Sequence, residues 1–249
     1  MKRKKVLVTG GAGFIGHHII HYLLNETNYD IVSLDRLDYS GSYNRIQQVI
    51  GQNEKWRRRV KIVWYDLKAE MNLITAKQIN KPDIILHLAA ASHVDRSIIE
   101  PLSFVLDNVV GTVNLLNYAK SLTKLEKFIY FSTDEVFGPA PLNIRYKEND
   151  RYNSGNPYAA SKAGAEEMCV AYNNTYKMPI IITHTMNVLG ERQHPEKYLP
   201  KIINHILNKK TLEIHSNKNK TKAGSRFYIH AKDVANAIYY ILKKGKAGE

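Results

Sequence analysis

A tyrosine and a lysine stand four residues apart in the segment YAASK, as Tyr158 and Lys162. Asn156-Pro157 precedes them, and proline suits the first turn of a helix, so both side chains should lie on one helical face. A lysine ammonium one turn from a phenol favours the phenolate, and we expect it to lower the pKa of Tyr158. The tyrosine could then accept an alcohol proton. The alternative is a half-buried tyrosine beside a solvent-facing lysine.

Two adjacent acids, Asp134 and Glu135, follow Ser132-Thr133 at the end of an apolar run. The run predicts a strand over 127–132, and ligands of open α/β sheets bind at such strand ends. Two carboxyl groups in different environments can supply an acid for a leaving hydroxyl and a base for a carbon proton. This pair would therefore suit the elimination of water, which a simple dehydrogenase does not need. Alternatively, the acids cap the next element or face water.

A glycine-rich segment, GGAGFIG at 10–16, stands between an apolar run and a helical pattern. Its glycines permit a tight turn and close approach to a pyrophosphate, which the following helix N-terminus attracts. Asp35 comes 19 residues after Gly16 and can bond both ribose hydroxyls of a dinucleotide. An acid there repels a 2′-phosphate, so NAD is favoured over NADP, although the adjacent Arg36 could accept that phosphate. A glycine turn without a ligand is the other interpretation.

Apolar runs alternate with helical patterns over most of the chain. Strands are predicted at 6–9, 31–35, 61–65, 84–89, 127–132 and 180–184, and helices at 14–24, 102–120 and 157–176. Strands joined by helices imply right-handed crossovers and a parallel sheet covered on both faces. We therefore predict a doubly wound α/β fold of the Rossmann type.

The pattern changes beyond residue 185. It predicts a helix ending near Lys209, short strands at 212–215 and 226–230, and a closing helix at 234–243. We predict a dinucleotide-binding domain over 1–185 that carries the catalytic residues, and a partial substrate lobe over 186–249.

The composition of the 249 residues, 44% hydrophobic and 24% charged, is that of an ordinary globular protein. The single cysteine, Cys169, excludes an internal disulfide and a cysteine-based zinc site. The N-terminus lacks the apolar core of a signal peptide, and no run approaches the roughly 20 apolar residues that span a bilayer, so we expect a cytoplasmic protein.

The formal net charge is +13, from 36 Lys and Arg against 23 Asp and Glu. The basic residues are dispersed and no nucleic-acid motif surrounds them, so a nucleic-acid partner is not expected. Solvated surface lysines explain most of the excess, and a phosphate-bearing small substrate is the alternative.

Three motifs, TGGAGFIG at 9–16, STDEVFG at 132–138 and YAASK at 158–162, together resemble the extended short-chain dehydrogenase/reductase family, and within it the nucleotide-sugar 4,6-dehydratases. Further similar segments follow in the same order: HLAAASHVDRS at 87–97, NPYAASKAGAE at 156–166, MNVLGERQHPEKYLP at 186–200, and 226–233. The Thr-Asp-Glu triplet distinguishes the dehydratases, because related epimerases and decarboxylases usually carry other residues there.

The resemblance implies a role for each matching residue. Thr133 would bond the sugar, Asp134 would be the general acid and Glu135 the general base. Tyr158 would be the base for oxidation at C4, with Lys162 as its electrostatic partner. The residues implied around NAD are Gly10, Gly13, Phe14, Ile15, Gly16, Asp35, Arg36, Leu37, Asp66, Leu67, Ala89, Ala90 and Ala91, with Tyr158 and Lys162. Those implied around the substrate are Ser92, Thr133, Asn187, Lys197 and Arg226, whose two cations would face its diphosphate.

The implied reaction converts dTDP-glucose or UDP-glucose to the 4-keto-6-deoxy sugar nucleotide, in a homodimer. Two departures from the family pattern stand out: Phe137 replaces a usual tyrosine, and the sequence ends at Glu249, where relatives continue, so we expect an incomplete substrate lobe. The alternatives are a 4-epimerase of the same fold, which would use Tyr158 and Lys162 without the acid pair, and a catalytically inactive NAD-binding protein.

Overall fold

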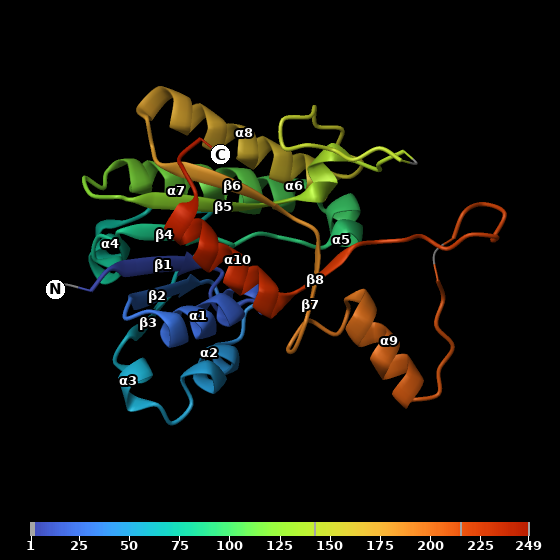
Figure 1. The fold of residues 1–249 in the computed structure, drawn as a ribbon, viewed down its shortest axis with the longest axis horizontal. Coiled ribbons are helices and arrows are strands. Elements are labelled where there is room, and N and C mark those ends of the chain that lie inside the picture. Colours follow the sequence, from blue (N-terminus) through green and yellow to red (C-terminus); the bar gives the residue numbers. More distant parts are fainter. Residues whose placement is uncertain (1–2, 142, 215, 249) are drawn as a thin grey trace.

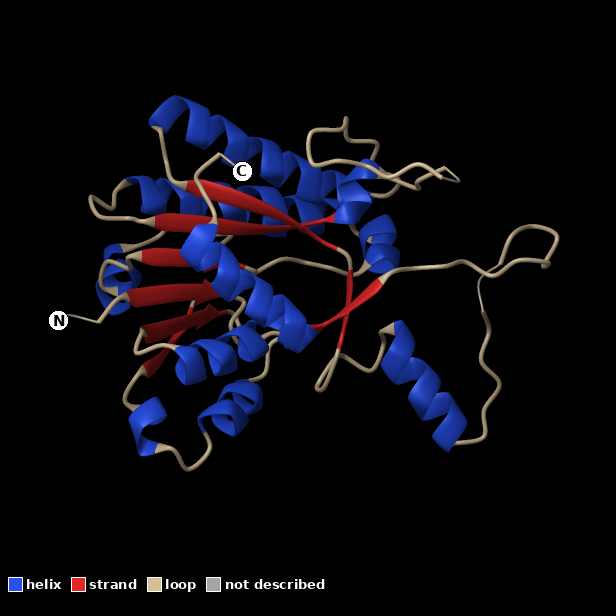
Figure 2. Ribbon diagram, in the orientation of Figure 1, coloured by secondary structure: helices blue, strands red, loops and turns tan. Residues whose placement is uncertain are grey.

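A six-stranded parallel sheet forms the centre of the molecule (Figures 1 and 2). The structure, a computed structural model, describes residues 3–141, 143–214 and 216–248. The strands are β1 (Lys5–Thr9), β2 (Asp30–Asp35), β3 (Val60–Trp64), β4 (Ile84–His87), β5 (Lys127–Thr133) and β6 (Ile180–Thr185). They lie in the order β3-β2-β1-β4-β5-β6, with every pair parallel. The predicted doubly wound fold is confirmed.

Helices cover both faces of the sheet because the strands are apolar on both sides. In β1, Val6 and Val8 pack in one cluster with α1 (Phe14–Glu26) and α10 (Ala231–Lys244). Leu7 points the other way, into a cluster with α7 (Gly111–Lys120) and α8 (Pro157–Tyr176). Figure 1 shows the two helical layers on opposite sides of the strands.

The helix predicted over 102–120 is interrupted. It consists of α6 (Pro101–Phe104), a π-helical turn η1 (Val105–Val110) and α7. The predicted helix over 157–176 is confirmed as α8. The remaining short helices, which the sequence analysis did not predict, are α2 (Tyr43–Ile50), α3 (Glu54–Arg57), α4 (Leu73–Ile79), α5 (Val94–Ile99) and the 3₁₀ turn η2 (Asp134–Phe137).

The segment after β6 forms a parallel pair, β7 (Asn187–Leu189) and β8 (Tyr228–His230), with α9 (Tyr198–Leu207) between them. The strand predicted over 212–215 is wrong for residues 212–214, which form no regular element: Leu212 is only half-buried and Ile214 is exposed, so the apolar face of the pattern is not covered. His215 lies outside the described residues. The strand predicted at 226 begins only at Tyr228.

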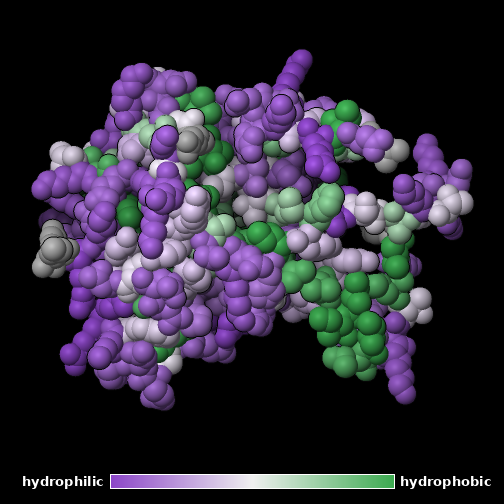
Figure 3. All heavy atoms as spheres, viewed as in Figure 1, coloured by the Kyte–Doolittle hydropathy of each residue, from purple (hydrophilic) through white to green (hydrophobic). Residues whose placement is uncertain are grey.

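Helix α9 stands apart from the sheet, and its apolar side chains Ile203, Ile206 and Leu207 are exposed, where Figure 3 shows a hydrophobic surface. In contrast, α10 returns to pack on α1, with Val234, Ala235 and Ile238 buried in the core. The proposed division at residue 185 stays a prediction. Among the described residues, no helix has both the length and the apolar character needed to cross a membrane.

Candidate active site

One cleft of about 340 Å³ opens at the carboxyl ends of the six strands. The predicted catalytic residues Thr133, Asp134, Glu135, Tyr158 and Lys162 all line it. The other predicted residues that line it are Gly10, Gly13, Phe14, Ile15, Gly16, Asp35, Arg36, Asp66, Leu67, Ala89, Ala90, Ala91, Ser92, Asn187 and Lys197. Of the predicted residues, Leu37 and Arg226 are not part of the lining. The fold therefore gathers segments that are distant in sequence around a single cavity.

The glycine loop fits a pyrophosphate for backbone reasons. Gly10 has a φ of +69°, and a Cβ there would lie 2.8 Å from the amide nitrogen of Ala89. A Cβ on Gly16 would lie 2.2 Å from the carbonyl oxygen of Gly10. Helix α1 starts after Gly13, a residue that has no side chain with which to cap the first N–H groups. Those donors can bind an anion.

Asp35 lies buried at the end of β2, where its carboxylate accepts hydrogen bonds from the backbone. Its Oδ1 accepts from the Leu37 N–H at 2.8 Å, and its Oδ2 accepts from the Ala12 N–H at 3.1 Å. Burial raises the pKa of Asp35, and these two hydrogen bonds act against that rise. Leu37 thus supports the cleft through its backbone, although it does not line the cavity.

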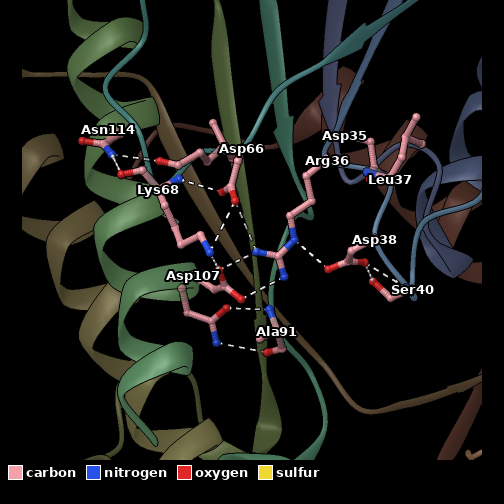
Figure 4. Close-up of polar contacts among 12 residues, drawn as sticks. Asp35, Arg36, Leu37, Asp38, Ser40, Asp66, Lys68, Ala91, Asp107 and Asn114 are labelled. Atoms are coloured by element: carbon pink, nitrogen blue, oxygen red, sulfur yellow. Dashed lines mark hydrogen bonds and ion pairs between the residues drawn. The ribbon is translucent and has the colours of Figure 1, made fainter. Parts of the chain in front are cut away.

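Arg36 points into a group of acids rather than into open solvent (Figure 4). Its Nη1 and Nη2 donate to Oδ1 and Oδ2 of Asp107 at 2.6 and 2.9 Å, and its Nε donates to Asp38 at 2.6 Å. The hydrogen bonds and charges of these carboxylates raise the pKa of Arg36 further. The sequence analysis did not identify Asp107, which lies 71 residues away in η1.

Two buried asparagines fix the backbone on the far rim of the cleft. Asn108 bonds both backbone groups of Ala91, at 2.8 and 3.1 Å, and donates to the Ser161 hydroxyl at 2.8 Å. Asn114 donates to the carbonyl of Leu67 at 2.8 Å. Because side-chain amides hold these loops, the predicted Ala91 and Leu67 positions are set by η1 and α7.

The start of α8 connects the tyrosine helix to the acid pair. Asn156 caps the helix by accepting from the Ala159 N–H at 2.8 Å, and its Nδ2 donates to Oε2 of Glu135 at 3.1 Å. Pro157 takes the first helical position, as expected. One asparagine therefore positions both the helix that carries Tyr158 and the carboxylate of Glu135.

Lys162 is buried in α8, one turn after Tyr158. Its ammonium donates to the carbonyl of Phe131 at 2.5 Å and lies 4.2 Å from the centre of the Tyr130 ring. Burial lowers the pKa of Lys162 to about 8. The lysine is therefore a desolvated cation that is easily neutralised.

The pKa of Tyr158 is raised, so the predicted lowering is wrong for this structure. Burial is the main cause, and the charge of Glu135 adds to it, while a hydrogen bond from Thr133 opposes the rise. Desolvation of the phenol outweighs a lysine that is turned towards Phe131.

The two acids lie in different environments, and their roles as general acid and general base stay a prediction. Thr133, buried at the end of β5, donates to Oδ1 of Asp134 at 3.3 Å and accepts from the Glu135 N–H at 3.3 Å. Asp134 is exposed, whereas Glu135 is half-buried and hydrogen-bonded to Asn156. The two carboxyl groups therefore differ in solvation although they are adjacent in sequence.

Phe137, the departure from the family pattern, is buried outside the cleft lining. Its ring centre lies 4.8 Å from that of His184 and 5.8 Å from that of Tyr146, which stacks on it. This side chain fills an aromatic cluster, so its missing hydroxyl removes no polar group from the cavity wall.

Of the residues predicted to meet a substrate diphosphate, Lys197 reaches the cleft and Arg226 does not. The Lys197 ammonium donates to the carbonyl of Ser92 at 2.9 Å, and burial lowers the pKa of Lys197. Asn187 lies on the same wall at the start of β7. Arg226 is exposed and donates to the Ser225 carbonyl outside the lining.

Four residues that the sequence analysis missed, Tyr39, Arg96, His194 and Glu196, link two loops and helix α5 beside the cleft; we call them the clasp. The Arg96 guanidinium lies 4.0 Å from the centre of the Tyr39 ring and donates to Glu196 at 3.0 Å. The Tyr39 ring meets that of His194 edge to face, with 5.8 Å between centres. Each clasp residue stands in a loop or short helix without a regular pattern, so no sequence signal brings the four together.

Comparison with known proteins agrees with this geometry. The NAD dependent epimerase/dehydratase family matches residues 6–249. A dTDP-D-glucose 4,6-dehydratase of Dictyostelium discoideum is 39% identical over 98% of this chain, which spans 57% of that relative. The human dTDP-D-glucose 4,6-dehydratase is also 39% identical, over 99% of this chain and 67% of its own length.

Solved structures give the same result. A dTDP-glucose 4,6-dehydratase from Streptomyces venezuelae, solved with NAD bound, is 34% identical with a TM-score of 0.88, covering 98% of this chain and 74% of its own. The NAD complex of a UDP-glucose 4-epimerase from Thermus thermophilus is 28% identical with a TM-score of 0.83, covering 96% of this chain and 75% of its own. The match over nearly the whole sequence, on the predicted fold, means that this chain belongs to the NAD dependent epimerase/dehydratase family.

Proposed function

We propose that this chain binds NAD and acts in the 4,6-dehydration of a nucleotide-diphosphate hexose, dTDP-glucose or UDP-glucose, as a hydro-lyase. The observation that carries the proposal is the presence of two kinds of proton-transfer group in one cleft. Tyr158 and Lys162 suit oxidation of an alcohol, and Asp134 and Glu135 suit elimination of water. The likeness to the dehydratases adds support.

The cleft suits NAD through its donor set. The glycine loop and the first turn of α1 would hold the pyrophosphate, and Asp35 would accept from the adenosine ribose. Bound NAD would supply the hydride acceptor at C4 and the hydride donor at C6. Everything else in the reaction is the movement of protons and the positioning of the sugar by side chains of this chain.

Tyr158 would accept the proton of the C4 hydroxyl as that carbon is oxidised. Burial raises the pKa of Tyr158 and keeps the phenol protonated, so this role requires that positive charge from the bound dinucleotide and the Lys162 ammonium stabilise the phenolate. The resulting C4 ketone acidifies the proton at C5. Glu135 would take that proton, while Asp134 would protonate the departing C6 hydroxyl, so that one water leaves and a C5–C6 double bond forms.

The substrate diphosphate would bind towards Lys197, which lines the cleft and is partly desolvated. We also propose a cytoplasmic location, since the one cysteine, Cys169, is buried and needs no oxidising compartment.

A 4-epimerase is the second candidate function, favoured by the structural likeness to UDP-glucose 4-epimerase. It would use Tyr158 and Lys162 in the same way, but its reaction has no step that needs Asp134 and Glu135. An inactive NAD-binding protein is the third possibility, and it would bind the dinucleotide without consuming a sugar nucleotide.

The deciding experiment compares Asp134→Asn and Glu135→Gln with the unaltered chain, using dTDP-glucose and UDP-glucose. Both variants should retain NAD and oxidise C4, yet lose dehydration by about 10² or more, because each removes a proton-transfer group of the second step. Single-turnover absorbance follows the reduced cofactor, and mass spectrometry follows the loss of water.

Glu167→Gln is the matched control, because Glu167 is an exposed acid on α8. It should leave both steps unchanged. Dehydration at the unaltered rate in both acid variants would contradict the assignment, and conversion to the C4 epimer without loss of water would favour the epimerase.

We further propose a homodimer. Exposed apolar side chains cluster on α5 and α6, namely Ile98, Ile99 and Leu102. Sedimentation velocity should give a dimer, and Ile99→Glu with Leu102→Glu should give a monomer. A monomeric unaltered chain would contradict this proposal.

A further inference from the structure

Arg36, the residue after the predicted ribose-binding acid Asp35, bears on whether the cleft selects NAD or NADP. In dinucleotide-binding folds, an arginine near this acid can hold the 2′-phosphate of NADP. Arg36 occupies that place and lines the cleft. Asp35 alone therefore does not fix the choice of dinucleotide. The choice also depends on whether the Arg36 guanidinium is free to bind a 2′-phosphate.

The guanidinium is already bound by acids on two sides. The Asp107 carboxylate accepts hydrogen bonds from both terminal nitrogens of Arg36, at 2.6 and 2.9 Å. The Asp38 carboxylate accepts a third hydrogen bond from Nε at 2.6 Å. Figure 4 shows the plane of the guanidinium held between these carboxylates, with Asp66 also near Nη1 at 3.8 Å. Two-point contacts between arginine and a carboxylate are the strongest ion pairs of this kind, so the donors that a phosphate would need are occupied.

Asp107 is the partner least able to move. Its side chain is only 8% exposed, compared with 26% for Asp38. It stands in the π-helical turn η1, and its neighbour Asn108 is buried and hydrogen-bonded to Ala91 and Ser161. π-helical turns frequently occur at functional sites. The turn therefore holds a carboxylate in place against the cleft wall.

Charge points in the same direction. Around Arg36 lie four carboxylates and two further cations: Lys68, which is 3.4 Å from Asp66 and 3.9 Å from Asp107, and Arg45, whose charge acts on Asp35. The carboxylates are those of Asp35, Asp38, Asp66 and Asp107, all in the cleft lining. A 2′-phosphate placed there would meet net negative charge.

We propose that Asp107 is a cofactor-specificity residue, which holds Arg36 away from the ribose and so makes the cleft select NAD over NADP. This rests on the proposed binding of NAD. Asp107 reaches the site from a helix, not from the glycine loop or the strand that carries Asp35, so this determinant is separate from both motifs.

The test measures the dissociation constants of NAD and NADP by calorimetry, without substrate or turnover. Asp107→Asn keeps the side-chain shape and removes the charge, so it should raise NADP affinity relative to NAD about tenfold. Asp38→Asn removes the charge of the more exposed partner and should raise NADP affinity relative to NAD by about threefold. This second variant keeps the test valid if Asp107→Asn does not fold. Glu126→Gln, which removes an acid paired with Lys4 at the opposite end of the sheet, should leave the ratio unchanged.

A double-mutant cycle with Arg36→Gln tests whether Asp107 affects dinucleotide binding through Arg36. The gain from Asp107→Asn should fall at least threefold in the Arg36→Gln background, because no guanidinium remains to be released. An equal gain in both backgrounds, or an unchanged ratio in the acid variants that fold, would overturn the role of Asp107. If the unaltered chain binds neither dinucleotide, the proposed function fails and this inference with it.

Discussion

Lys162→Met should stabilise the folded chain while abolishing its chemistry. Burial lowers the pKa of Lys162 from an ordinary 10.5 to about 8. That difference means that holding the ammonium in the folded state at neutral pH costs about 3 kcal/mol. Methionine has a similar volume and no charge, but it loses the hydrogen bond to Phe131. We therefore expect about 1 to 3 kcal/mol of added stability.

Urea unfolding at neutral pH, without dinucleotide, measures this change. The matched control is Lys127→Met, because the Lys127 ammonium satisfies three carbonyls at the end of α10, those of Ile241, Leu242 and Gly245. Removing it should destabilise the chain by about 1 to 3 kcal/mol. The two lysine-to-methionine substitutions should thus change the free energy of unfolding in opposite directions.

The pH dependence provides a second measurement. Between about 8 and 10.5, Lys162 has lost its proton in the folded state and keeps it in the unfolded state. The unfolded state then binds more protons, so this group makes stability rise with pH, and the rise should be absent in Lys162→Met. A variant that is less stable than the unaltered chain by more than about 1 kcal/mol would refute the reasoning, since the Phe131 and Tyr130 contacts would then outweigh desolvation.

Two further predictions concern the cleft. Tyr158→Phe should bind NAD normally but fail to form reduced cofactor in a single turnover with substrate, and a normal rate would exclude the tyrosine as the base. Arg96→Ala removes the cation over Tyr39 and the pair with Glu196, contacts worth together about 1 to 2 kcal/mol, so NAD should leave about five- to thirtyfold faster in stopped-flow displacement. Unchanged release would mean that the clasp does not restrain the cofactor.

The sheet and the positions of the main motifs could be predicted because each depends on local pattern. The strand end at Asp35 follows from an apolar run, that of β5 was predicted within one residue of Thr133, and the start of α8 follows from Asn156-Pro157. Once the strands are parallel, their carboxyl ends meet at one edge. The shared location of the glycine loop, the acid pair and Tyr158 then needs no further information.

The predictions that failed depend on surroundings rather than pattern. The pKa of Tyr158 follows from desolvation and from Glu135, neither of which a four-residue spacing reveals. Asp107 was missed because its partner is 71 residues away, and the π-helical turn that presents it has no sequence signature. Contacts of this kind become visible only when the tertiary structure is known.

The net charge of +13 does not describe the charge of the cleft. Its lining contains seven carboxylates and four Lys or Arg side chains, so the site is acidic within a basic protein. Three of those cations are already held: Arg36 by the carboxylates of Asp107 and Asp38, and Arg45 and Lys162 by backbone carbonyls. Lys197 also donates to a carbonyl, that of Ser92, but it is only half-buried, so attraction of a substrate diphosphate would fall to Lys197 and that of the dinucleotide pyrophosphate to the α1 N-terminus. Because these are few and local, selectivity at this site depends on which cations are left available, and not on the overall charge.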